Sequence, residues 1–175
     1  NSKYVSFLDV KNIFPIKSNY FDYVFTEHLI EHLDYGEGCH LIKESFRVLK
    51  PGGKIRIATP NVKYLINLYD KERTNIEQME IQRIVQKYFP NVNIYDELFV
   101  INNFFYNWGH KFIYDFKILT QSMRHNGFIN INENSVSESD DVNFRELEYH
   151  GVIIGEEINK LQTFVLEATK PYYPL

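Results

Sequence analysis

Residues 21–61 read FDYVFTEHLIEHLDYGEGCHLIKESFRVLKPGGKIRIATPN and contain the pattern that decides the fold. Phe21 to Phe25 form a short apolar run, whose length and aromatic content predict a buried strand. From Glu37 to Lys50, apolar and charged residues fall on opposite faces of a predicted helix. Pro51 and the two following glycines then favour a tight turn into a second strand at residues 54–59. The stretch predicts a strand–helix–strand unit with parallel strands.

Three short motifs in this stretch resemble those of class I S-adenosylmethionine-dependent methyltransferases. They are the Phe21-Asp22 pair that opens the first strand, the Glu31-His32 pair that follows it, and the turn sequence from Arg47 to Gly53. Upstream, Leu8-Asp9-Val10 is similar to the acidic end of the family's third strand. Downstream, the segment from His110 to Phe128 resembles its late helix and strand, so the likeness covers nearly the whole chain.

The resemblance implies an α/β fold, a Rossmann-like three-layer sandwich. Its sheet would be mostly parallel, with only the last strand, Thr163 to Thr169, antiparallel. The residues from Tyr4 to Leu8 are predicted to form the first strand of the chain. The glycine-rich loop that wraps the cofactor in this family has no counterpart, and Gly36 is the first glycine. We therefore expect a domain that lacks the family's N-terminal strands.

The resemblance also implies S-adenosylmethionine as the cofactor and suggests which residues bind it. Asp9 matches the acidic residue that accepts a hydrogen bond from the adenine amino group, and Val10 offers the next backbone N–H. Thr26 and Glu27 follow a predicted strand, and ligands of open parallel sheets bind beyond the carboxyl ends of the strands. We predict that these four residues are the cofactor-binding residues. A turn or cap role for Asp9 and Thr26 is the alternative.

Three histidines are the candidate catalytic residues. His28 and His32 lie in the segment that the resemblance places beside the transferable methyl group, and His110 precedes the late helix. A histidine could serve as general base if the methyl acceptor must lose a proton.

The same segment supports a rival hypothesis. His28, Glu31 and His32 spell H-x-x-E-H, the zinc-binding pattern of one class of peptidases. The pattern requires a continuous helix, but Asp34, Gly36 and Gly38 interrupt the helical periodicity directly after it. We therefore predict no metal site, and a zinc hydrolase remains as a less favoured alternative.

Residues 1–175 are predicted to form a single domain, in which residues 61–112 are a helical insertion. Asn61 is a candidate helix cap, and Thr74 and Glu77 form a capping-box pattern. The resemblance places such an insertion over the substrate pocket as a lid. The acidic, serine-rich segment from Glu133 to Asp141 is expected to be a solvated loop.

Composition limits the remaining possibilities. The hydrophobic content of 44% is enough for a core, and no apolar run approaches the ~20 residues of a membrane-spanning helix. The single Cys39 excludes an internal disulfide and favours the cytoplasm. The net charge of −4 without a basic cluster argues against nucleic acid as a partner.

Together these features predict a methyltransferase that transfers a methyl group to an unidentified small-molecule or macromolecular acceptor. The alternative of another class is a degenerate, non-catalytic binding or scaffold module. Removal of the family's first strands would expose the edge of the strand at Phe21 to Phe25. We expect either Tyr4 to Leu8 or a second copy of the chain, in a homodimer, to pair with that edge.

Overall fold

A strand–helix–strand unit organises the protein, as the sequence predicts. The computed structural model describes residues 5–173. Strand β1 (Phe21–Glu27) runs parallel to β2 (Leu49–Pro60), and helix α1 (Tyr35–Val48) connects them. The parallel βαβ prediction is therefore confirmed.

Helix α1 begins two residues earlier than the sequence pattern indicated. Asp34 is its N-cap and forms a capping box with Glu37, which satisfies two of the free backbone N–H groups at the helix start. Gly36 and Gly38 consequently lie inside the helix and do not interrupt it. Gly38 is needed there because a Cβ atom at this position would lie 2.2 Å from the hydroxyl oxygen of Tyr114.

The sheet has four strands in the order β1-β2-β4-β3, which adds β3 (Ile129–Asn134) and β4 (Thr163–Thr169). β4 runs antiparallel to both of its neighbours, as predicted for the last strand. The α/β class is confirmed, but the expectation of a mostly parallel sheet is wrong. Only β1 and β2 pair in parallel within residues 5–173, because β4 inserts between β2 and the edge strand β3.

The predicted first strand is not present. Residues 5–8 adopt no regular structure, and Val5 and Phe7 are 67% and 92% exposed, while Tyr4 lies outside the described residues. These residues therefore do not pair with β1, whose outer edge has no strand beside it in the described part of the chain. An apolar run becomes a strand only where a neighbour supplies hydrogen-bond partners. Pairing of this edge with a second copy stays a prediction.

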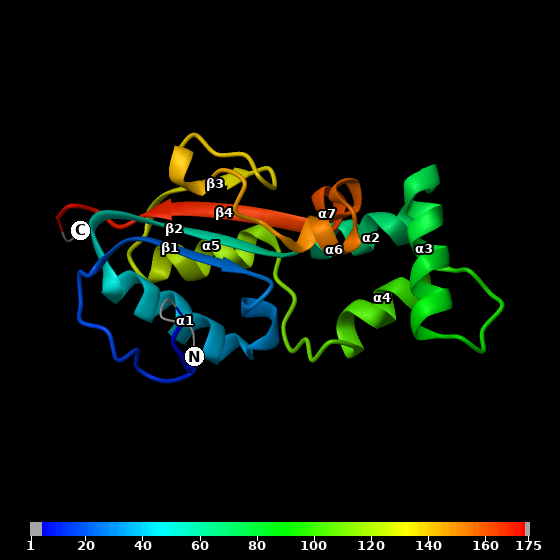
Figure 1. The fold of residues 1–175 in the computed structure, drawn as a ribbon, viewed down its shortest axis with the longest axis horizontal. Helices are drawn as coiled ribbons and strands as arrows, with labels where there is room; N and C mark the ends of the chain where they lie inside the picture. Colours follow the sequence, from blue (N-terminus) through cyan, green and yellow to red (C-terminus); the bar gives the residue numbers. More distant parts are fainter. Residues whose placement is uncertain (1–4, 174–175) are drawn as a thin grey trace.

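The main core lies between the sheet and helices α1 and α5 (Phe116–His125), which cover one face of it (Figure 1). Asp115 caps α5 as predicted, and its carboxylate accepts a hydrogen bond from the N–H of Ile118. The chain before β1 also packs onto this core. The N–H of Phe14 donates to Glu44, and Arg47 donates to the carbonyl oxygens of Phe14 and Ile16.

The 61–112 segment forms three helices beyond one end of the sheet (Figure 1). They are α2 (Val62–Asp70), α3 (Asn75–Tyr88) and α4 (Glu97–Tyr106). They share an apolar cluster of their own, which includes Leu65, Ile84 and Phe104. The caps predicted at Asn61 and Thr74 are present. The remaining elements are η1 (Ile30–His32), η2 (Val142–Phe144), α6 (His150–Ile154) and α7 (Glu156–Gln162).

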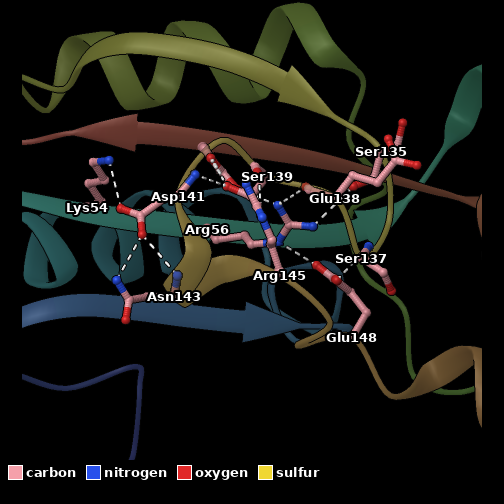
Figure 2. A network of polar contacts seen from close by, with 11 residues as sticks. Lys54, Arg56, Ser135, Ser137, Glu138, Ser139, Asp141, Asn143, Arg145 and Glu148 are labelled. Carbon is pink, nitrogen blue, oxygen red and sulfur yellow. Dashed lines mark hydrogen bonds and ion pairs between the residues drawn. The ribbon is translucent and has the colours of Figure 1, made fainter.

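A buried arginine binds the 135–148 loop to the other face of the sheet (Figure 2). The Arg56 side chain is fully buried and donates to Glu148 at 2.6 Å, to Glu167, and to the carbonyl oxygens of Ser135 and Glu138. We call these residues the Arg56 cluster. The expectation of a solvated loop at residues 133–141 is therefore only partly right, because four of these residues are exposed but the loop also binds a buried charge. The polar residues of this loop satisfy a charge on β2, which sequence spacing does not reveal.

None of the helices within residues 5–173 is both long and apolar enough to cross a membrane.

Candidate active site

A cavity of about 270 Å³ lies beyond the carboxyl ends of β1 and β2. This edge is where an open α/β sheet binds its ligands. Four histidines, one buried glutamate and an aromatic wall surround the cavity. The lining residues that carry the argument are His28, Glu31, His32, Trp108, His110 and His150.

The polypeptide turns sharply after β1, and this turn places two of the predicted histidines. His28 has a φ of 47°, and its N–H still donates to the carbonyl oxygen of Ala58 on β2. The turn is followed by the short 3-10 helix η1. His28 and His32 therefore do not share a continuous helix. The helical geometry that the H-x-x-E-H zinc motif requires is not formed.

Glu31 is the buried centre of the site, with a side chain that is 0% exposed. One carboxylate oxygen, Oε2, accepts a hydrogen bond from the Thr59 hydroxyl at 3.0 Å, and Oε1 lies 3.2 Å from Nδ1 of His28. Nε2 of His32 lies 4.0 Å from Oε1. Burial alone would raise the pKa of Glu31, but the hydrogen bond and charge of His28 outweigh burial and hold this pKa below its ordinary value.

His28 itself is held at both ring nitrogens. The Thr163 hydroxyl donates its only hydrogen to Asn159, so it accepts from Nε2 of His28 at 3.3 Å. Nδ1 of His28 faces the Glu31 carboxylate, which is favourable when this nitrogen also carries a proton. The two ring nitrogens of His28 thus connect Glu31 with Thr163.

His110 comes to the site from far along the chain. The N–H groups of Lys111 and Phe112 both donate to the carbonyl oxygen of Glu31, at 2.8 and 3.2 Å. Nδ1 of His110 lies 2.6 Å from the carbonyl oxygen of Phe104, to which it must donate, so Nε2 keeps a free lone pair. Burial, first of all, lowers the pKa of His110 below its ordinary value. The ring centroid of His110 lies 4.9 Å from that of His32.

His150 is a pocket residue that the sequence did not suggest. It begins α6, whose first backbone N–H groups, those of Tyr149 and His150, donate to the Glu27 carboxylate at 2.9–3.0 Å. Its ring lies 4.0 Å from that of His28. Burial, and then the nearby charge of His28, lower the pKa of His150. No local pattern marks this histidine, because only the fold brings α6 beside β1.

The four predicted cofactor-binding residues are not gathered in the cavity. Asp9 is exposed, and its carboxylate accepts from the N–H of Lys11 and the side chain of Asn12, as a turn residue does. Val10 packs against the main core. Glu27 holds α6. Thr26 lies within β1, outside the residues that line the cavity, and its buried hydroxyl has no hydrogen-bond partner in the described part of the chain.

The comparison with protein families finds a match for the N-terminal third of the chain. Residues 3–57 match the model of the methyltransferase domain. This segment is similar to the methyltransferase domain and makes up about a third of the chain. The resemblance inferred from the motifs is confirmed, and the family uses S-adenosylmethionine. No curated protein matches the chain.

Solved structures that cover most of this chain were also found. A possible exported protein from Bordetella parapertussis is 12% identical with a TM-score of 0.53, over 93% of this chain and 42% of its own. An S-adenosylmethionine-dependent methyltransferase from Archaeoglobus fulgidus is 19% identical with a TM-score of 0.47, over 89% and 62%. A possible histamine N-methyltransferase from Thermotoga maritima is 18% identical with a TM-score of 0.48, over 92% and 61%. The chain thus spans less than two thirds of each of these proteins.

The cavity combines a polar wall and an aromatic wall. Tyr88, Phe104 and Trp108, all from the helical insertion or just after it, form the aromatic side. His28, His32 and His110 form the polar side around Glu31, and the ring of His110 also lies beside that of Trp108, with centroids 5.6 Å apart. Such a cavity can orient a small polar group while the aromatic rings restrict access of water.

Proposed function

We propose that the protein transfers a methyl group from S-adenosylmethionine to an acceptor whose reacting group enters the histidine-lined cavity. The observation that carries this proposal is the position of the cavity at the carboxyl ends of β1 and β2, in a chain whose residues 3–57 match the methyltransferase domain. The acceptor is a small molecule or a group on a macromolecule. The helices of residues 61–112 act as the lid that closes over it.

S-adenosylmethionine supplies an electrophilic methyl carbon on a sulfonium sulfur. The residues proposed to bind it are Asp9, Val10, Thr26 and Glu27. This assignment rests on the resemblance and on the position of Thr26 and Glu27 toward the carboxyl end of β1. Glu27 contributes by holding α6, and with it His150, at the cavity.

The residues of the protein align the acceptor with the methyl group and remove a proton from the acceptor. Positioning of two reacting groups can supply up to about 7–11 kcal/mol. When a hydroxyl or protonated amine attacks the methyl carbon, its proton must leave, and a general base contributes about 10²- to 10⁴-fold in rate. His28, His32 and His110 are the candidates. His110 is the best-placed base, because its Nε2 has a free lone pair and its lowered pKa keeps the ring neutral near pH 7.

Calorimetric titration of the protein in its full natural length with S-adenosylhomocysteine tests the proposal. We expect one site per chain. The Asp9→Ala variant should bind about 10- to 100-fold more weakly, the effect of losing one hydrogen bond to a charged group. Asp22→Ala is the matched control, because Asp22 is an exposed carboxylate paired only with Lys50.

Equal binding by Asp9→Ala and the unmodified protein would show that Asp9 does not contact the adenine. If the unmodified protein does not bind S-adenosylhomocysteine, the methyltransferase proposal is wrong and a non-catalytic binding module takes its place.

A further inference from the structure

Glu31 differs from every other buried glutamate in the described part of the chain. Glu44, Glu80 and Glu148 each pair with an arginine, at 2.6–2.7 Å. Glu31 is the most deeply buried of the four, yet within residues 5–173 the only basic side chains within 4.0 Å of its carboxylate are histidines. A buried carboxylate needs either a paired charge or a metal ion. The histidine environment makes Glu31 a candidate metal ligand.

The ligand atoms of three side chains lie close enough to share an ion. One donor atom from each of Glu31, His32 and His110 falls within 4.8 Å of the others. Ligands at about 2.0–2.2 Å from a zinc ion lie roughly 3–3.5 Å apart, so a small inward rotation completes the site. His32 can supply this rotation, since its side chain is 36% exposed and its ring makes no hydrogen bond among the described residues.

The surroundings of His110 match those of a metal-binding histidine. Its Nδ1 N–H donates to the carbonyl oxygen of Phe104, which fixes the tautomer and leaves the Nε2 lone pair for a ligand. Metal-bound histidines nearly always donate their second ring nitrogen to a carbonyl or carboxylate in this way. The Glu31 carboxylate is likewise oriented by the Thr59 hydroxyl.

We propose that Glu31, His32 and His110 bind one divalent transition-metal ion, with zinc as the reference ion. Two imidazoles and one carboxylate suit zinc and related ions, and three protein ligands leave coordination positions open toward the cavity. This site differs from the H-x-x-E-H hypothesis, because His110 replaces His28 and no continuous helix is needed.

The role of the ion rests on the proposed function. An ion at this place binds an oxygen of the acceptor, which indicates a hydroxyl- or carboxyl-bearing acceptor. On coordination the hydroxyl proton passes to solvent water and the oxygen keeps the electron pair. In the metal-loaded protein His110 is a ligand and not the base.

Zinc alone is the probe. Untagged protein of full natural length is titrated with zinc chloride by calorimetry, and we expect one site per chain. His32→Ala and His110→Ala should each weaken binding by more than about 100-fold, since loss of even an outer hydrogen-bond partner costs about 10- to 100-fold. His150→Ala is the matched control, a histidine of the same cavity outside the ligand set, and should bind zinc as the unmodified protein does.

Cobalt(II) provides a second measurement that needs no variant. Trp108 is the only tryptophan of this chain, and its ring lies 5.6 Å from that of His110, so bound cobalt should quench its fluorescence. X-ray absorption of the zinc complex should show two imidazole ligands. The proposal is overturned if the unmodified protein binds no zinc or if the zinc complex shows no imidazole ligands. It is also overturned if His32→Ala and His110→Ala bind zinc as tightly as the unmodified protein.

The two proposals fail separately. A protein that binds S-adenosylhomocysteine but no zinc retains the methyltransferase function and loses the metal site. A protein that binds zinc but not S-adenosylhomocysteine keeps the metal site and refutes the methyl-transfer role.

Discussion

Two buried charges, Arg56 on strand β2 and Glu31 in the 3-10 helix η1, have opposite kinds of surroundings. Arg56 on β2 is fully buried, and two carboxylates and two backbone carbonyls surround its guanidinium group. Glu31 is equally buried, but it has a hydroxyl and histidines as neighbours and borders a cavity. We call Glu31, His28, His32, Thr59 and His110 the Glu31 cluster. The Arg56 cluster is closed, whereas the Glu31 cluster is open to a ligand.

The partners of a buried charge indicate whether that charge has a structural or a functional role. A buried charge whose hydrogen-bonding capacity is filled by the protein stabilises one arrangement of the chain, here the 135–148 loop on the sheet (Figure 2). A buried charge partnered by ionisable rings beside a cavity keeps capacity for a substrate, a proton or an ion. The following substitutions test this contrast.

The largest effect is expected for Arg56→Met. Methionine fills much of the space but leaves the Glu148 carboxylate buried without its partner, and breaking a buried pair in this way costs about 3–5 kcal/mol. The free energy of unfolding from urea titration measures the loss. Lys50→Met is the control, because the Lys50–Asp22 pair is 45% and 67% exposed, and such surface pairs contribute about 0–1 kcal/mol. Similar losses in both variants would refute the structural role of the Arg56 cluster.

A smaller loss is expected for Glu31→Gln. Glutamine keeps an oxygen for the Thr59 hydroxyl but removes the charge opposite His28, so we expect the unfolding free energy to fall by about 1–3 kcal/mol. The same urea titration measures it. A loss as large as that of Arg56→Met would mean that the Glu31 cluster is as structural as the Arg56 cluster, and the contrast would disappear.

The smallest effect is a pH dependence at His150. The pKa of His150 in the folded protein lies below its ordinary value of 6.5, so between these two values the unfolded chain binds more protons. Stability is therefore fully present above pH 6.5 and declines as the pH falls toward the folded pKa. His150→Gln should make this decline shallower in unfolding titrations repeated from pH 7.5 to 5. An unchanged or steeper slope would contradict the assignment.

Much of the fold was predictable because its signals are local. The caps at Asn61, Thr74 and Asp115 depend on side chains that bond to backbone groups two or three residues away. The apolar periodicity of α1 and the composition of β4 likewise depend on neighbouring residues. By contrast, the apolar run at residues 5–8 looks like a strand but has no strand beside it, and pairing is a non-local property.

The candidate site was predictable only in part. The motif resemblance singled out His28, His32 and His110, and the structure places all three at one cavity, where their catalytic role stays a prediction. It did not indicate that Glu31 is buried at the centre of the site or that His150 lines the cavity. Burial of a side chain and contact between distant segments are not encoded in short spacings.

The sequence by itself predicted strands β1, β3 and β4, the core of β2, helices α1 to α5 and the resemblance to methyltransferases, because periodicity, capping and motifs act over a few residues. It did not predict α6, α7 or the 3-10 helices, and β2 begins earlier than expected. Only the tertiary structure decided which buried charges are fully surrounded by protein groups and which border a cavity. His110 follows Glu31 by nearly eighty residues and meets it because the backbone at Lys111 and Phe112 bonds to the Glu31 carbonyl. Such long-range hydrogen bonds form only once the core has packed, so the chemistry of the cavity belongs to the folded chain.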